Sequence, residues 1–224
     1  MLFDIRKFNI HSLKDFFREY IMIVVGILTA LGIEQIAASR HHAHLAAEAR
    51  EHIMVELRSN LEDVRNSIAE NVNRREALDK LITTLQQDIK DGVRADKINV
   101  RLAEAVANLS LGYALPANRH EEWDVAVANQ SASYMDAADL RRFSAAYAEQ
   151  REIAELTNAG GSQLVNGPRL IDALTDVEMQ RADPVEVLKV FKQMTSTLNS
   201  TIGNLSQMRK ELVSALVEDK ASKK

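Results

Sequence analysis

Four histidines and one carboxylate near the start of this chain are the first residues that could do chemistry. The histidines are His41, His42, His44 and His52, and Glu48 stands between the last two. His44, Glu48 and His52 are four residues apart, so they would share one face of a helix. Such side chains bind zinc or copper when a neighbouring element completes the ligand shell. We interpret the cluster as a polar collar beside a membrane, and we predict that the chain binds no metal and no cofactor. In the alternative, in which a metal does bind, His44, Glu48 and His52 are the candidate ligands.

A second group, the sequence HEEWD at 120–124, begins like the zinc-binding helix of a metalloprotease. Asp124 occupies the place where that helix requires its second histidine, and no histidine follows His120. The glycine-rich segment 158–162 lacks the Lys-Ser/Thr ending of a phosphate loop. No paired catalytic groups occur at local spacing, and we predict that the chain is not an enzyme.

Glu34 lies at the edge of the most apolar stretch of the chain. Residues 20–38 are long enough, at about 28 Å, to cross the hydrocarbon core of a bilayer as one helix. At the outer boundary of such a span the Glu34 carboxylate can reach water. Gly26 and Ala30 are four residues apart and form a small-residue face, continued by Glu34, on which a partner span could pack. We predict a transmembrane helix at 20–38.

The residues before this span favour a retained anchor over a cleavable signal. Segment 1–19 is acidic in part, and its apolar face predicts an interfacial amphipathic helix, with Ser12 as N-cap and Asp15 as its partner. The alternative is cleavage near 37–39, where small residues stand. Four Lys/Arg residues precede the span and two follow it closely, which favours a cytoplasmic N-terminus and a periplasmic C-terminal domain at a bacterial inner membrane. A cytoplasmic domain remains the alternative.

Composition limits the fold and the partners. The chain of 224 residues has 5% aromatic residues, three prolines and no cysteine, and helix-favouring residues dominate. Disulfides and thiolate chemistry are therefore excluded. The net charge of −4 provides no basic field for a phosphate backbone, so we predict no nucleic-acid partner.

Apolar periodicity predicts an all-α fold in which the transmembrane helix continues into a long helix within an elongated antiparallel bundle. No proline occurs between Ser12 and Asp91, and Gly92 is a natural helix stop. Asp183-Pro184 begins a second long helix whose apolar stripe has a coiled-coil period. We assign residues 39–219 to one bundle domain and 220–224 to a basic tail. Shorter helices are expected at 98–111, 120–129, 137–156 and 170–179, with Trp123 and Val127 docking on the long helix and a loop at 158–162.

Several local patterns resemble an uncharacterised family of bacterial single-pass inner-membrane proteins, a domain of unknown function. They are LKDFFREY followed by GILTALG-x-E-Q, then MVELRSNLEDV, EEWDVAVANQSASYMDAADL and FSAAYAEQREI. The last contains an aromatic-x-x-Gln motif, here Tyr147 and Gln150. The resemblance covers about two thirds of the chain and implies an anchor with an all-helical soluble domain. It implies no activity and no catalytic residue.

Two functions are consistent with these features. The first is a membrane-anchored scaffold or adaptor, with membrane lipid and either other subunits or further copies of the chain as partners. The second is a periplasmic module that senses a ligand or metal and signals through a partner protein.

Overall fold

The computed structural model describes residues 13–107, 109–165 and 167–217, although the side chains of 13–15 and 158–165 are not described. Within these ranges the chain forms six α-helices and one short 3-10 helix, without any strand. The predicted all-α fold is confirmed. The elements are α1 (Leu13–Lys90), α2 (Ala95–Ala107), α3 (Glu121–Ala128), η1 (Ser131–Tyr134), α4 (Ala137–Val165), α5 (Pro168–Glu178) and α6 (Pro184–Leu216).

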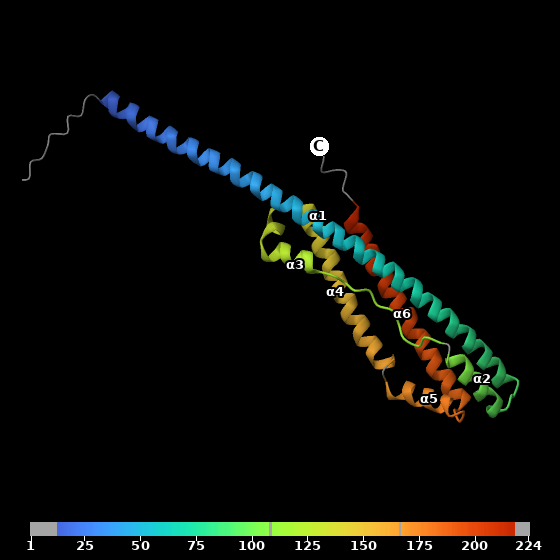
Figure 1. Cartoon of the computed structure of the whole chain (residues 1–224). Coiled ribbons are helices and arrows are strands. Elements are labelled where there is room, and N and C mark those ends of the chain that lie inside the picture. The colour runs from blue at the N-terminus through green and yellow to red at the C-terminus, as the bar shows by residue number, and fades with distance from the viewer. Residues whose placement is uncertain (1–12, 108, 166, 218–224) are drawn as a thin grey trace, which may run out of the picture.

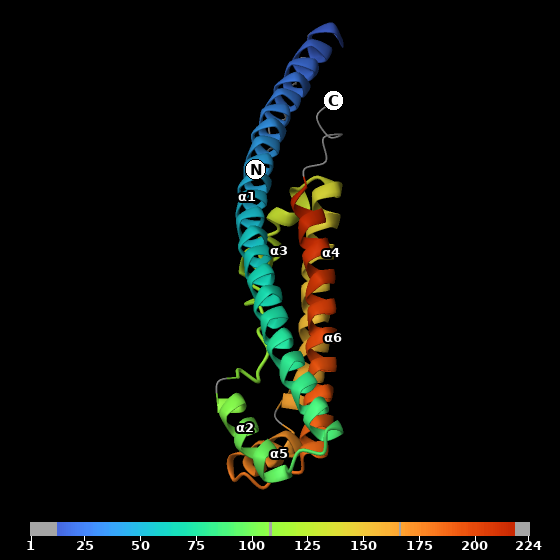
Figure 2. The ribbon, with the colours of Figure 1, turned by 90° about the vertical axis from the view of Figure 1, so that its right-hand side faces the viewer.

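Helix α1 is continuous over 78 residues, as its lack of proline predicts. Its N-terminal part projects beyond the bundle, and the remainder runs along the full length of the bundle (Figures 1 and 2). The helix ends at Lys90, and Gly92, two residues further on, has a left-handed φ of 66°. Val93 N–H donates to the carbonyl oxygen of Asp88 at 3.0 Å, which closes a Schellman-type C-terminus. The predicted stop is therefore confirmed.

The projecting part of α1 contains the predicted span. In the described part of the chain, α1 is the one helix that is long and apolar enough to cross a membrane, and its most apolar window is not buried by any other element. Residues 13–19 belong to the same helix. The predicted cap by Ser12 and Asp15 and the basic tail at 220–224 lie outside the described residues and side chains.

Helix α6 runs antiparallel to α1, which confirms the predicted pairing (Figure 2). Asp183 caps it by accepting the backbone N–H of Val185 at 2.9 Å, and Pro184 occupies the first helical position. Glu186, in the first turn of α6, pairs with Arg169 and Lys189.

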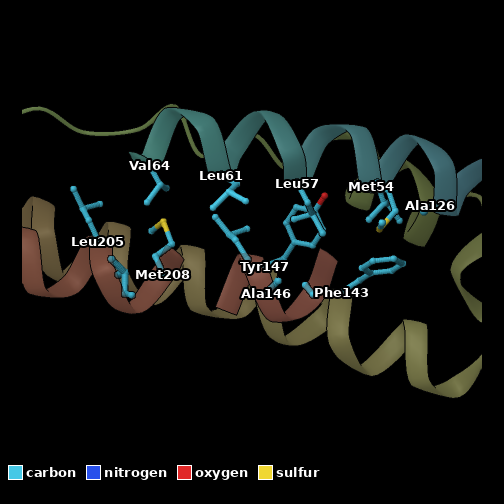
Figure 3. Packing of buried hydrophobic residues seen from close by; sticks show 14 of the residues in the cluster. Met54, Leu57, Leu61, Val64, Ala126, Phe143, Ala146, Tyr147, Leu205 and Met208 are labelled. Carbon is cyan, nitrogen blue, oxygen red and sulfur yellow. The ribbon is translucent and has the colours of Figure 1, made fainter. Parts of the chain in front are cut away.

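The core consists of two apolar clusters along the α1–α6 contact. The cluster nearer the projecting end also receives the inner face of α4, including Phe143 and Tyr147 (Figure 3). Its α1 members are Ile53, Met54, Leu57, Leu61 and Val64, and its α6 members are Leu205, Met208, Leu212 and Ala215. The other cluster joins Leu78, Ile82 and Leu85 to the first half of α6 and to α2 and α5. Most of the predicted α6 stripe is buried, although Ile202 and Leu216 are only half-buried.

Three local predictions are wrong. The loop at 158–162 does not form, because α4 continues to Val165. Each glycine in a helix costs only about 1 kcal/mol, whereas Pro168 disfavours the helical conformation in the residue before it, and Gly167 is extended. Val127 is exposed, and Ala126 is the residue of α3 that is buried against the core.

The helix expected at 98–111 begins earlier and ends at Ala107. Residues 109–119 form no helix or strand, and we call them the extended segment. Leu109, Leu111 and Tyr113 pack against the second cluster. Their spacing of two residues is the spacing of an extended chain and explains why the helix does not continue through them.

Candidate functional site

Polar side chains of α1 face α4 and hold the two helices in parallel register. Arg50 Nε donates to Asp139 Oδ2 at 2.7 Å, and further along Tyr147 Oη donates to Glu56 Oε1 at 2.5 Å. In the third contact Asn60 Nδ2 donates to Gln150 Oε1 at 2.9 Å. The residue offset between the partners stays between 89 and 91, so the three contacts fix one register along both helices.

Glu56 is a buried carboxylate, 6% exposed, at the centre of this register. Its second oxygen accepts the backbone N–H of Glu122 at 3.0 Å, in the first turn of α3. The positive end of the α3 dipole favours a carboxylate there. Burial of the Tyr147 phenol and its contact with Glu56 raise the pKa of Tyr147 well above its usual value, so the hydroxyl remains a donor. Its hydroxyl points toward α1 (Figure 3).

Two buried asparagines of α1 bind the extended segment through its backbone. Asn71 Nδ2 donates to the carbonyl of Ala114 at 2.9 Å, and Ala114 N–H donates to Asn71 Oδ1 at 2.7 Å. Asn60 makes the same pair of bonds with Arg119, at 2.7 and 3.1 Å. Asn60 and Asn71 are eleven helical residues, about 16 Å, apart along α1, and the chain from Ala114 to Arg119 bridges that separation.

A cleft of about 280 Å³ opens where the extended segment, α3 and α4 meet. Trp123 and Tyr147 stack in its wall with ring centroids 5.4 Å apart. Two residues that line it, Gln150 and Asn118, each have a buried amide atom, Nε2 and Oδ1 respectively, without a hydrogen-bond partner among the described residues. The remaining lining residues are Arg119, His120, Asp124, Arg151 and Ala154. This cleft, with its stacked aromatic wall and two unsatisfied amide groups, is a candidate binding site.

The histidine collar does not converge on one point. His44 and Glu48 are exposed on α1, while the Nδ1 atom of His52 lies 3.3 Å from Glu122 Oε2. His42 stacks on Tyr134 of η1 with ring centroids 3.9 Å apart. Across the described ranges, no three His, Asp or Glu side chains lie close enough together to hold a metal ion.

The histidine of the HEEWD sequence has a local role at the start of α3. His120 precedes the first helical residue, and its Nδ1 atom lies 2.8 Å from Asp124 Oδ2, one turn further on. Asp124, which replaces the second histidine of a zinc-binding helix, is thus the partner of His120. Both residues line the cleft.

The proposed helix-packing face, Gly26, Ala30 and Glu34, lies on the projecting part of α1. No other part of the described chain covers these residues, and a Cβ built on Gly26 would meet no atom within 4 Å. The face is available to lipid or to another helix.

Glu56, Asn60 and Asn71 were missed as site residues by the sequence analysis. The sequence does contain a pattern that could have identified them. Polar residues recur at helical spacing beside the apolar stripe of α1, and the structure buries all four of them: Glu56, Asn60, Ser67 and Asn71. Tyr147 and Gln150, noted only as a motif, are the partners of Glu56 and Asn60 across the bundle.

Comparison of the chain with protein-family models, curated proteins and solved structures finds no match.

Replacing Asn71 with Ala should remove both partners of the Ala114 backbone and lower the free energy of unfolding by about 1–3 kcal/mol. Denaturant unfolding of the full-length protein in mild detergent, followed by fluorescence of Trp123, the only tryptophan, measures this change. Asn73→Ala is the matched control, because Asn73 is exposed on the same helix, and its effect should stay within about 0.5 kcal/mol. Equal effects of the two substitutions would contradict the assigned role of Asn71.

The raised pKa of Tyr147 should make the bundle sensitive to alkali. In the unfolded chain tyrosine ionises near pH 10, whereas folded Tyr147 keeps its proton. Its contribution to stability is therefore complete below about pH 10 and is lost as pH rises above that value. Tyr147→Phe should be less stable than the parent at pH 8, because Glu56 loses a donor, yet should lose less stability between pH 9 and 11. The exposed Tyr134→Phe serves as the control, and an identical alkaline loss in parent and Tyr147→Phe would refute the assignment.

Proposed function

We propose that this chain is a single-pass protein of the bacterial inner membrane and that its helical bundle is a scaffold or adaptor. The observation that carries the proposal is the continuity of α1, which runs without a break from its apolar, uncovered end into the core of the bundle. Such a helix would hold the bundle at a fixed distance and direction from the bilayer. The resemblance to the uncharacterised single-pass family supports the same assignment.

The proposed partners are lipid and protein. Lipid would surround residues 20–38, and the Gly26–Ala30 face offers close helix packing to another subunit or a second copy of the chain. We propose no nucleic-acid partner, because the net charge of −4 provides no basic field for a phosphate backbone. We also propose no enzymatic activity, because the sequence shows no paired catalytic groups at local spacing.

Continuity of α1 can be measured with spin labels, because the chain contains no cysteine. Labels at Ile33→Cys and Arg65→Cys are 32 helical residues apart, so the full-length protein in lipid nanodiscs should give one narrow distance near about 48 Å. Ala43→Pro, at an exposed position between the predicted span and the bundle, should broaden the distribution by removing a helix hydrogen bond. If the parent distribution is as broad as that of Ala43→Pro, the rigid connection is wrong.

Orientation is a further part of the proposal and rests on the Lys/Arg counts on the two sides of the span. A reporter that is active only in the periplasm, fused after Lys224, should be active in a Gram-negative host. A silent periplasmic reporter together with an active cytoplasmic one would reverse the orientation.

A second candidate function is ligand sensing, and the cleft beside Trp123 is the observation that favours it. A signal from this module would require a partner protein.

A further inference from the structure

The orientation of the Gln150 amide follows from the backbone that surrounds it. Arg119 N–H donates to Asn60 Oδ1, which fixes the Asn60 amide so that its Nδ2 faces Gln150. Gln150 must then present Oε1 to Asn60, and its Nε2 group has no partner among the described residues. Gln150 is 4% exposed and lines the cleft. A buried N–H donor without an acceptor is costly, and a ligand acceptor in the cleft would relieve that cost.

Asn118 supplies an acceptor to the same cleft. Its backbone has a φ of 48°, in the left-handed region that asparagine tolerates better than most residues. Its Oδ1 atom is buried and has no partner in the described chain. Sparsely populated backbone conformations often mark binding sites. Two residues of the cleft lining therefore contribute one unsatisfied donor and one unsatisfied acceptor, and a neutral amide group, with its carbonyl and N–H, has the complementary pair.

More of the cleft surface around this pair is apolar than polar, although Arg119, His120, Asp124 and Arg151 also line it. Trp123, Tyr147 and Ala154 contribute to the walls of the cleft. A second cavity of about 270 Å³ shares Asn118 and Ala154 with the cleft, and Leu205 and Met208 line it. It also contains the buried hydroxyl of Thr157, which has no partner among the described residues. A ligand bound at the amide pair would thus have an apolar cavity next to it.

We propose that this cleft binds a small ligand with a neutral amide group joined to an apolar side chain, as in a blocked amino acid or a short peptide. The volume of the cleft is close to the lower end of the range of about 300–1,000 Å³ for small-molecule sites, which fits one such unit. This ligand would be the small molecule that the protein detects in the proposed sensing function. Binding here does not depend on the continuity of α1, which the spin-label distances test separately.

The test is a titration of the full-length protein in detergent with N-acetyl-L-leucinamide, which is not fluorescent. Because Trp123 is the only tryptophan and lines the cleft, its emission should change saturably. N-acetyl-Gly-Leu-Gly-amide, used in parallel, distinguishes the two sources: tighter binding of the tripeptide assigns the site to peptides, and tighter binding of the leucinamide assigns it to blocked amino acids. Zwitterionic leucine, which has no amide, should bind at least tenfold more weakly than the better probe.

Three variants locate the binding. Asn118→Gly removes the acceptor, and glycine accepts the left-handed backbone without strain, so the fold is preserved. Both Asn118→Gly and Gln150→Leu should weaken binding by about tenfold. Ala154→Phe should fill the shared wall and abolish it. Gln207→Leu, on the exposed part of α6, is the matched control and should bind like the parent.

The proposal is overturned if neither probe gives a saturable change with the parent protein up to its solubility limit. It is equally overturned if Ala154→Phe, or Asn118→Gly and Gln150→Leu together, bind as tightly as the parent.

Discussion

The structure depends on two buried asparagine side chains that replace a β-strand as the partner of an extended segment. Residues 109–119 lie against α1, where some of their backbone groups would otherwise lack partners. Asn71 and Asn60 each satisfy one N–H and one carbonyl of this segment, at Ala114 and Arg119. The second pair also fixes the start of α3, since Glu121 follows two residues after Arg119. The N-terminus of α3 can then meet Glu56, and Glu56 in turn holds Tyr147 of α4.

Helix α1 divides its contacts by chemistry. Its apolar side chains pack against α6, where direct burial stabilises the antiparallel pair. Its polar side chains reach α3, α4 and the extended segment, where hydrogen bonds set the register. Apolar contacts are non-directional and would tolerate a shift, whereas paired amides and a carboxylate with two donors do not. The polar contacts therefore specify one arrangement of a bundle whose stability comes from its apolar contacts.

The sequence predicted the parts of the fold that depend on periodicity. The uninterrupted α1, its stop at Gly92, the cap at Asp183 and the antiparallel pairing all follow from local rules. The extended segment was missed because Leu109 and Leu111 were counted into a helix instead of an alternating pattern. Gly160 and Gly161 predicted a break that the structure does not have. The cleft could not be predicted at all, because Asn118, Trp123 and Gln150 come together only through contacts far apart in sequence.

The cleft is a consequence of the way α1 and α4 are joined. Each of these helices packs against α6, while between them long polar side chains span the gap at Glu56 and Asn60. The Gln150 carbonyl accepts from Asn60, and its Nε2 group has no partner among the described residues. A ligand that accepts from this group would bind the folded state alone and would stabilise the contact between α1 and α4 by mass action. The contact between α1 and α4 lies at the end of the bundle nearer the projecting part of α1 (Figure 1). Ligand binding in the cleft would therefore act on the part of α1 that leads toward the predicted membrane span.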